Sequence, residues 1–489
     1  MKSKYIKHSL VALGLGMVTA SCGNLLDIND DPARLTSNQV TISGLLPTAI
    51  QYTANSYWNV GQYGNYYPQY LAGHSGQEKN IDSYTPYGFD NIWETSYLRA
   101  MPNLKELIDR AEAQGAPQYA GVAKVLMALN LMQCTDLWGD LPYSEAFKGS
   151  AVLMPKYDKQ QDIYGVHLKN LLDEAIADLD QAPPASATLK VGASDLIYGG
   201  TIAKWKMAAY AVRSRYYLHL GKKDPANYAK AAADAQNAFN DRTGAADLEL
   251  KYPADRVITW SWYSYIFKTA AASRSARPSK YFVDLMNGSA TGVYPGLVDP
   301  RISKLVDNGG AATYVGRPVG VLGTDAGAAA ANTDLTDKTF YGKQFTVTPL
   351  ISYAEVQFIK AESLFSTDKA ASYAAFLEGI KSSMLKFGVD NASIDAYVNN
   401  SLISKGAANL TISDIMLQKY IALFLQMETW TDMRRHQYDP TVYVGLTQPG
   451  LNQLGTSWVQ RAKYPDNEPG RNVNVPKVGN QAEKIWLFQ

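Results

Sequence analysis

Residues 203–239 read AKWKMAAYAVRSRYYLHLGKKDPANYAKAAADAQNAF and show the helical pattern most clearly. Two helical stretches, Ala203 to Leu220 and Tyr228 to Phe239, flank a turn at residues 222–227. Alanine recurs at the positions where the two stretches would meet, and small side chains let helices approach each other closely. The pattern predicts a pair of helices packed side by side.

Similar helical stretches occur along the rest of the chain. They cover Tyr119 to Thr135, Asp162 to Gln181, Ile351 to Phe365 and Ala371 to Phe387. The stretch from Tyr210 through Gly221 to Ala238 resembles a tetratricopeptide unit with a lengthened turn. We therefore predict an all-α dominated fold of degenerate tetratricopeptide-like helix pairs. The pairs should form a concave right-handed stack, with long structured loop inserts gathered on one side.

A further helix is expected near the C-terminus. Apolar residues recur there at three- and four-residue steps, which is typical of one helical face. They are Met416, Tyr420, Leu423, Met427 and Trp430. Thr411 and Asp414 are spaced as an N-cap and its reciprocal partner, and Arg434 and Arg435 fall where a helix end favours positive charge. The spacing predicts one helix from Thr411 to Arg435.

Three long inserts interrupt the helical pattern, at residues 51–93, 251–280 and 295–349. Long structured loops usually carry function. No Pro/Ser-rich linker divides the chain, so we predict a single domain over residues 41–489. A signal peptide (1–21) and a tether (22–40) should precede it.

The beginning of the chain resembles an export signal. Three lysines precede a short apolar run, Leu10 to Ala20. The segment Ala20-Ser21-Cys22-Gly23 resembles the lipobox of bacterial lipoproteins, in which the cysteine receives the lipid. No later stretch has the roughly 20 apolar residues of a membrane helix. We therefore expect a lipid anchor at Cys22, which leaves Cys134 as a buried, inert thiol.

The composition argues against nucleic-acid binding and indicates a folded protein. The 489 residues carry 46 basic and 45 acidic side chains, so no strong field is available to bind nucleic acid. Hydrophobic residues make up 46% of the chain and charged residues 19%, which is typical of a globular protein. Tyrosine occurs 33 times against 9 Trp and 13 Phe, and its flat apolar face with a polar tip suits binding surfaces.

Motifs of catalysis and metal binding are largely missing. The five histidines lie far apart, none at the spacing of metal ligands, and no phosphate-binding glycine motif occurs. Asp136 and Asp140 could act as the acid and base of a glycosidase. Carboxylates at a helix end more often serve as caps and ion-pair partners. We expect no metal, no cofactor and no enzymatic activity.

Two aromatic clusters indicate a ligand surface. The first, residues 57–70, mixes rings with Asn and Gln and contains Gly61 and Gly64, so we expect a loop. The second, Trp260 to Tyr265, alternates as a strand would. Sugars lay C–H faces on aromatic rings and need neutral hydrogen-bonding groups. The expected ligand platform comprises Trp58, Tyr66, Tyr67, Trp260, Trp262 and Tyr263. Alternatively, these rings pin long loops to the helical body.

Three motifs together resemble one known family. They are DLWGDLPYSEA (136–146), ISYAEVQFIKAE (351–362) and WTDMRR (430–435). In this order, with the lipobox and the YPDNE segment (464–468), they resemble the SusD/RagB family. They identify the scaffold and not a ligand site, since the DLWGDLP segment ends a helix and packs a turn.

The resemblance implies a surface-exposed, lipid-anchored outer-membrane protein that captures nutrients, usually glycans, and caps a SusC-like TonB-dependent porin. We expect it to bind oligosaccharide or polysaccharide and to deliver it to this transporter. Peptide binding is the main alternative, for which Arg274, Arg277 and Arg317 could supply charge. A glycan-degrading enzyme and a purely structural repeat protein are the other interpretations.

The anchor at Cys22 predicts that Cys22→Ser releases the protein from the membrane fraction, because only lipid or partners would hold such a body there. Fractionation and immunoblotting in cells that lack the transporter measure this. Cys134→Ser, outside the lipobox, is the control and should stay bound. Full membrane retention of the Cys22→Ser protein would contradict lipidation.

Overall fold

The computed structural model describes residues 40–252, 262, 275–321, 326–343 and 346–489. Helices dominate this part of the chain, which confirms the predicted all-α class. The long helices are α2 (Ile42–Gly64), α5 (Met101–Ala113), α6 (Pro117–Trp138), α8 (Lys169–Leu179), α9 (Ile202–Leu220), α10 (Ala226–Asn237), α15 (Tyr353–Leu364), α16 (Lys369–Lys386) and α18 (Ile412–Ala422). The short α-helices are α3 (Gly76–Asp82), α4 (Asp90–Glu94), α7 (Gln160–Asp162), α12 (Lys280–Asp284), α13 (Ile302–Leu305), α14 (Ala326–Ala329), α17 (Asn391–Val398), α19 (Glu428–Arg435) and α20 (Glu468–Arg471). The π- and 3-10 helical turns are η2 (Thr95–Ala100), η3 (Gly149–Ala151), η4 (Ile163–Leu168), η5 (Ala187–Leu189), η7 (Ala407–Asn409) and η8 (Trp486–Phe488).

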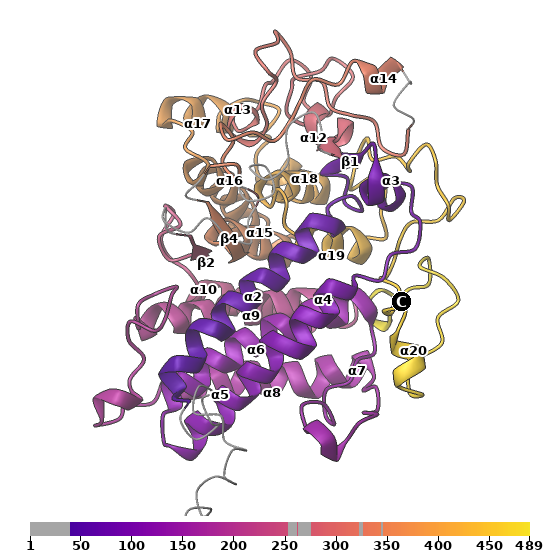
Figure 1. Cartoon of the computed structure of the whole chain (residues 1–489). Coiled ribbons are helices and arrows are strands. Elements are labelled where there is room, and N and C mark those ends of the chain that lie inside the picture. Colours follow the sequence, from indigo (N-terminus) through magenta and orange to yellow (C-terminus); the bar gives the residue numbers. More distant parts are fainter. Residues whose placement is uncertain (1–39, 253–261, 263–274, 322–325, 344–345) are drawn as a thin grey trace, which may run out of the picture.

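Consecutive helices pack as the alanine pattern predicts. α9 packs on α10 and α15 on α16, while α6 contacts both α5 and α8 (Figure 1). Glycine permits two of these contacts. A Cβ added at Gly221 would lie 2.5 Å from the ring of Tyr228, and one added at Gly121 would lie 2.7 Å from Leu179. The predicted helix pairs are thus present, whereas the right-handed concave form of the stack stays a prediction.

Predicted helix ends are confirmed where a local signal exists. At the start of α18, Thr411 Oγ1 accepts from Asp414 N at 3.1 Å, and the Asp414 carboxylate accepts from Thr411 N at 3.0 Å. α6 ends at Trp138 and is capped by Gly139, whose φ of +84° suits glycine. An antiparallel bridge between Leu141 and Asp158 holds the following turn. The DLWGDLP segment therefore ends a helix and packs a turn, as predicted.

Two other predicted boundaries are wrong. Residues 57–64 belong to α2 and not to a loop, because Gly61 and Gly64 admit neighbouring residues close to the helix without interrupting it. The single helix expected from Thr411 to Arg435 is two helices, separated by a turn in which Leu425 has a φ of +63°. This left-handed conformation is unfavourable for leucine and needs support from surrounding structure.

Two small antiparallel sheets join segments that are far apart in the sequence. They pair β1 (Leu71–Gly73) with β3 (Ala276–Pro278), and β2 (Leu248–Lys251) with β4 (Val347–Ile351). Leu71 lies opposite Pro278, and the second ladder has an irregularity between Leu248 and Glu249. The first ladder joins two of the predicted inserts, residues 51–93 and 251–280, to each other. α12, α13 and α14 gather at the end drawn at the top of Figure 1.

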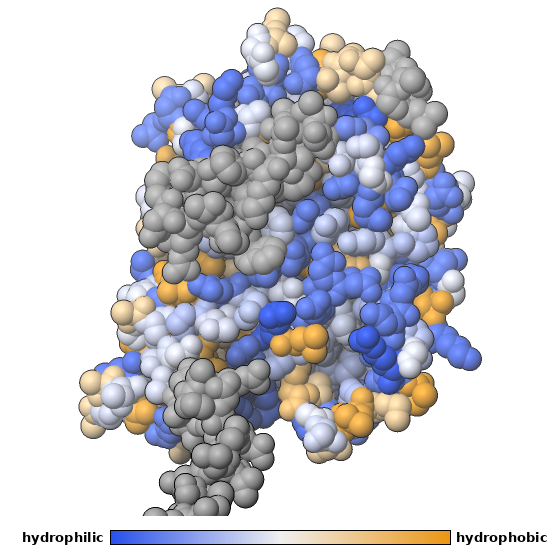
Figure 2. Space-filling view, in the orientation of Figure 1, coloured by the Kyte–Doolittle hydropathy of each residue, from blue (hydrophilic) through white to orange (hydrophobic). Residues whose placement is uncertain are grey.

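The core combines aromatic and aliphatic side chains, among which Trp138, Trp205 and Trp430 are fully buried. Cys134 is a buried free thiol, which confirms the expectation from sequence, and burial raises its pKa to about 12. Hydrophilic side chains cover most of the face in Figure 2, with apolar ones in small groups. None of the helices that the structure describes has the length and hydrophobicity of a membrane span. The boundaries of signal peptide, tether and single domain stay predictions.

Candidate functional site

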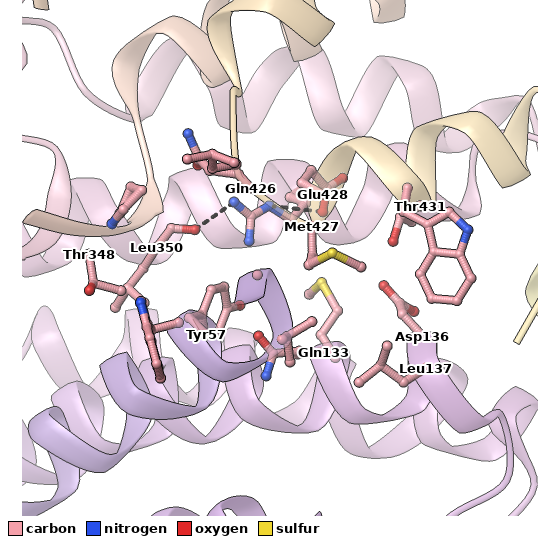
Figure 3. Close-up of a pocket in the computed structure, with 18 of the residues that line it drawn as sticks. Tyr57, Gln133, Asp136, Leu137, Thr348, Leu350, Gln426, Met427, Glu428 and Thr431 are labelled. Carbon is pink, nitrogen blue, oxygen red and sulfur yellow. Dashed lines mark hydrogen bonds and ion pairs between the residues drawn. The ribbon is translucent and has the colours of Figure 1, made fainter. Parts of the chain in front are cut away.

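A cavity lies where α2, α6 and α9 meet β4 and the turn between α18 and α19 (Figure 3). Its volume is about 60 Å³, which is room for a few water molecules. The wall combines aromatic, amide, hydroxyl and charged side chains. The main contributors are Tyr57, Trp58, Gln133, Asp136, Arg215, Trp262, Thr348, Gln426, Met427, Glu428 and Thr431.

Two glycines of α2 bring the turn after α18 against that helix. A Cβ added at Gly61 would lie 3.2 Å from the carbonyl oxygen of Leu425, and one added at Gly64 would lie 2.4 Å from the end of the Met427 side chain. Asn65 fixes the turn, because its Nδ2 donates to the Leu425 oxygen at 3.0 Å and to the Gly61 oxygen at 2.6 Å. These contacts hold Leu425 in its left-handed conformation and present the next residues of the turn to the cavity.

Arg215 lines the cavity and forms a buried ion pair with Glu355; we call this side of the cavity its floor. Arg215 of α9 donates to Glu355 of α15 through Nε at 2.7 Å and Nη2 at 2.8 Å. Its Nη2 also donates to the carbonyl oxygen of Leu350 in β4 at 2.7 Å, and Glu428 Oε2 lies 3.5 Å from its Nε (Figure 3). The side chains of Arg215 and Glu355 are 3% and 0% exposed. One guanidinium therefore joins two helices, a strand and the start of α19.

His219 extends this network to α6. Its Nε2 lies 2.7 Å from Glu428 Oε1, and its Nδ1 lies 2.9 Å from the hydroxyl of Tyr164, which donates to Asp136 Oδ1 at 2.5 Å. Burial alone would raise the pKa of Glu428, but His219 and Arg215 outweigh it and lower that pKa to about 2. Burial dominates at Asp136 and raises its pKa. Glu428 is therefore the firmly ionised carboxylate of the network.

The two carboxylates considered for catalysis are engaged with protein groups. Asp136 is 5% exposed and accepts from Tyr164. Asp140 accepts from Lys159 Nζ at 2.8 Å and from the Gln160 backbone nitrogen at 3.0 Å. Both serve as hydrogen-bond or ion-pair partners, the role expected of acids near a helix end. Across the described ranges, no group of three His, Cys, Asp or Glu side chains could hold a metal ion.

The structure brings two of the predicted ligand residues together. Trp58 and Trp262 both line the cavity, and a Cβ added at Gly61 would lie 3.9 Å from Trp262 Cζ2. Trp58 is half-buried and Trp262 is 5% exposed. Trp262 is helical, so the strand expected from Trp260 to Tyr265 is wrong at the one residue of it that the structure describes; Trp260 and Tyr263 lie outside the described residues.

Tyr66 and Tyr67 offer no surface to a ligand, which corrects their placement on the platform. They are 2% and 1% exposed, and the ring of Tyr67 packs on that of Trp430 with centroids 4.8 Å apart. For these two residues the alternative holds, in which aromatic side chains pin their segment to the helical body. Sequence gave no way to separate them from Trp58, because Asn and Gln surround buried and half-buried rings alike.

Sequence reasoning also missed the contribution of the turn before α19. Gln426 and Glu428 line the cavity, yet they lie within what the sequence predicted to be a continuous helix. No Gly or Pro marks the break at Leu425. The only available signal was an acidic residue inside an apolar helical pattern, and that signal is weak.

Comparisons with known protein families and with solved structures agree on one family and one fold for this chain. The SusD-like family described as "Starch-binding associating with outer membrane" matches residues 32–465. A solved chitin-binding protein is similar with a TM-score of 0.73 and 22% identity, over 92% of this chain and 100% of its own. A SusD/RagB family protein from Bacteroides thetaiotaomicron has a TM-score of 0.71 and 22% identity, over 92% and 99%. A chitin-binding SusD homologue from Flavobacterium johnsoniae has a TM-score of 0.73 and 19% identity, over 92% and 98%. No curated protein matches the chain. At these identities the solved structures establish the fold alone.

Glu428→Gln tests the electrostatic role of this carboxylate. Because the pKa of Glu428 is lowered from 4.5 to about 2, its charge stabilises the folded protein above pH 4.5, and this contribution is lost as the pH falls through about 2. The shift corresponds to roughly 3 kcal/mol in the free energy of unfolding. We expect urea denaturation to show a deficit of that size at neutral pH, which shrinks as the pH falls from 4.5 to about 2.

Glu106→Gln is the matched control, because Glu106 is a 49% exposed partner of Arg110 on α5. Exposed pairs of this spacing contribute about 0.3–0.5 kcal/mol, so this variant should unfold close to wild type throughout the pH range. A Glu428→Gln deficit that stays the same from neutral to acidic pH would contradict the low pKa.

Proposed function

Since this chain belongs to the SusD-like family, described as starch-binding and associating with the outer membrane, we propose that it is a lipid-anchored outer-membrane protein exposed at the cell surface. There it binds oligosaccharide or polysaccharide and delivers it to a SusC-like TonB-dependent transporter. Family membership supports glycan binding, and two of the similar solved structures are chitin-binding proteins.

The observation that carries the ligand proposal is the pair of tryptophans at one cavity. Trp58 and Trp262 supply flat apolar rings for the C–H faces of sugars, and amide and hydroxyl side chains of the wall supply neutral hydrogen bonds. A volume of about 60 Å³ is smaller than a sugar ring, so the saccharide lies across the mouth of the cavity. Trp260 and Tyr263 are further proposed contacts of this platform.

The arrangement of the charged groups at the cavity suits a binding protein better than an enzyme. A catalytic acid or base must exchange a proton with the substrate. Here Arg215 is paired with Glu355, and His219 is hydrogen-bonded to Glu428 and, through the Tyr164 hydroxyl, is connected to Asp136. We propose that this network shapes the floor beneath the ligand and that the protein is not an enzyme.

The described arginines do not favour the peptide alternative. Arg277 lies 3.6 Å from Asp334. Arg317 is 5% exposed and donates to the carbonyl oxygen of Val321 at 3.4 Å. Arg274 lies outside the described residues. Both described guanidinium groups are thus engaged with the protein, and a neutral glycan is the better-supported ligand.

Trp58→Ala and Trp262→Ala should each weaken the binding of the starch- or chitin-derived oligosaccharide that the wild-type protein takes. Aromatic contacts contribute roughly 0.5–1.5 kcal/mol beyond burial, so the dissociation constant should rise about two- to tenfold in calorimetry. Trp486→Ala is the matched control, since Trp486 is also half-buried but does not line this cavity. Unchanged affinity in both cavity variants, with native circular dichroism spectra, would overturn the site.

The transporter partner is proposed from the family resemblance of the three sequence motifs. The proposed cleavage before Cys22 removes three lysines and takes the formal charge from +1 to −2, which gives little electrostatic steering, so the complex should depend on shape and apolar contact. A permanent complex should also bury more than the roughly 1,200–2,000 Å² of a standard interface.

We expect purification from native membranes in mild detergent to recover this protein together with a TonB-dependent porin. Because contact and not charge should hold the pair, the yield of porin should change little between low and high salt. Mass spectrometry identifies the partner, with a strain expressing the untagged protein as the control. Recovery of this protein alone at every salt concentration would contradict the prediction of a stable complex.

A further inference from the structure

Two loops that are far apart in the sequence meet at the surface of the protein. The first, residues 148–156 between α6 and α7, reads KGSAVLMPK, and the second, residues 469–478, reads PGRNVNVPKV. Asn472 Nδ2 donates to the carbonyl oxygen of Pro155 at 2.8 Å, and Asn474 Nδ2 donates to that of Met154 at 3.0 Å. These bonds join the loops into one surface, which we call the paired-loop surface. Neither loop contributes a residue to the first cavity.

The paired-loop surface exposes large apolar side chains. Leu153 is 79% exposed and Val473 is 82% exposed, more than any other large apolar side chain in the described part of the chain. Met154, between them in the contact of the two loops, is 51% exposed. Single exposed apolar residues are common, but neighbouring ones indicate a surface that contacts an apolar partner. Figure 2 shows one small group of apolar side chains at its lower right, where α20 lies in Figure 1.

Positive charge surrounds these apolar side chains. The two loops contain no acidic residue and four basic ones, all exposed, namely Lys148, Lys156, Arg471 and Lys477. Lys156 lies 3.8 Å from Glu145, whereas the other three form no ion pair with any described residue. Glu468, next to the second loop, accepts from the Tyr157 hydroxyl at 2.9 Å. The surface is therefore locally basic, although the mature chain as a whole has a proposed charge of −2.

This combination of side chains fits a lipid surface better than a saccharide or a protein. Neither loop has an aromatic ring on which a sugar could lie. Protein interfaces are enriched in aromatic residues and depleted in lysine, and these loops show the opposite. At the surface of an anionic membrane, apolar side chains enter the boundary between headgroups and acyl chains, while lysine and arginine reach the headgroups.

The backbone of the first loop is also suited to such a boundary. Polar backbone groups without a partner are costly wherever water is scarce. The carbonyl oxygens of Met154 and Pro155 are occupied by the two asparagines of the second loop. Lys156 N donates to Glu145 Oε2 at 3.0 Å. The loop can therefore approach a less polar phase without giving up these hydrogen bonds.

The place where the described chain begins agrees with a membrane on this side. The start of α2, the loop between α6 and α7, and α20 all lie in the lower half of Figure 1. Eighteen residues, 22–39, separate the proposed lipid-bearing Cys22 from the first described residue. A chain of that length reaches at most roughly 60 Å. The tether is thus long enough for the paired-loop surface to touch the membrane that holds the lipid.

We propose that the paired-loop surface docks on an anionic lipid surface. The inference goes beyond the proposed function and takes from it only the lipid anchor. Leu153, Met154 and Val473 enter the boundary between headgroups and acyl chains, and the basic side chains contact the headgroup phosphates. Few side chains take part, so the contact is weak and acts as a second signal beside the lipid. Washing should therefore still release the Cys22→Ser protein from membranes.

Flotation with lipid vesicles tests this docking. The protein is the mature chain, residues 22–489, with Cys22→Ser, so that it carries neither export signal nor lipid. The vesicles consist of phosphatidylcholine with or without phosphatidylglycerol. Each basic residue near an anionic surface raises affinity about fivefold, so we expect at least about tenfold tighter binding to the vesicles with phosphatidylglycerol. This preference should fall as salt is added.

Leu153→Asp/Val473→Asp removes the apolar contact. Its affinity for the anionic vesicles should fall at least about tenfold, because burial of two large apolar side chains is lost. Both side chains are exposed, so the Tm should not change. Val298→Asp/Leu451→Asp is the matched control, since these residues are 54% and 41% exposed, lie outside both loops and add the same charge. The control should bind as the unsubstituted chain does.

Lys148→Gln/Lys477→Gln removes two of the basic groups. Its affinity for the anionic vesicles should fall about 10- to 30-fold, while its weak binding to phosphatidylcholine alone stays the same. Lys222→Gln/Lys251→Gln is the control, because it removes the same charge from exposed positions elsewhere. This control should keep the preference for anionic vesicles.

Two results would overturn the docking surface. They are equal binding to both kinds of vesicle, and binding of Leu153→Asp/Val473→Asp that equals its control. If that variant, with Cys22 intact, binds vesicles normally but loses the porin in detergent purification, the surface is a protein interface and the lipid proposal is wrong. Because the vesicle test uses protein without lipid, its failure would leave the acylation of Cys22 and saccharide binding at Trp58 standing.

Discussion

The buried guanidinium of Arg215 couples the positions of α9, α15 and β4. A charge removed from water is tolerated only when it is paired and hydrogen-bonded, and removal of one partner typically costs about 3–5 kcal/mol. Arg215 meets this demand through the Glu355 carboxylate and the Leu350 carbonyl oxygen. Because those partners lie on α15 and β4, neither element can move away from α9 without leaving a buried charge exposed to an apolar interior. The floor of the first cavity is therefore rigid for an electrostatic reason.

Buried ion pairs also fix the positions of the C-terminal helices α18 and α19. Lys419 of α18 lies 2.7 Å from Asp432 of α19, while Arg435 reaches both Asp432, at 2.6 Å, and Glu362 of α15, at 2.9 Å. These side chains are at most 2% exposed. Charges on both sides of the turn at Leu425 thus hold α18 and α19 against α15. The strained turn persists because opening it would separate these buried pairs.

Sequence predicted the scaffold well where the deciding residues are neighbours in the chain. The capping box at Thr411 and the alanine-rich helix pairs are of this kind, since each signal lies within a few residues of its effect. The burial of Tyr67 depends on Trp430, and the turn at Leu425 depends on Asn65, which is 360 residues away. A sequence pattern does not reveal contacts between residues that lie so far apart in the chain. For the same reason, composition identified the two tryptophans of the first cavity as candidates but could not show that they share it.

The division between scaffold and loops also limits which residues can change ligand specificity without destabilising the fold. The similar solved structures keep this fold at identities of 19–22%, so the fold alone does not specify a ligand. Changes at Arg215 or Glu362 would leave a buried charge unpaired, and stability therefore restricts them. Val293 and Val321 line a cavity beside α12 and take part in none of these buried ion pairs, so changes there alter the shape of that cavity without removing a charge partner. Specificity can consequently vary on the loops while the charge network keeps the same backbone beneath them.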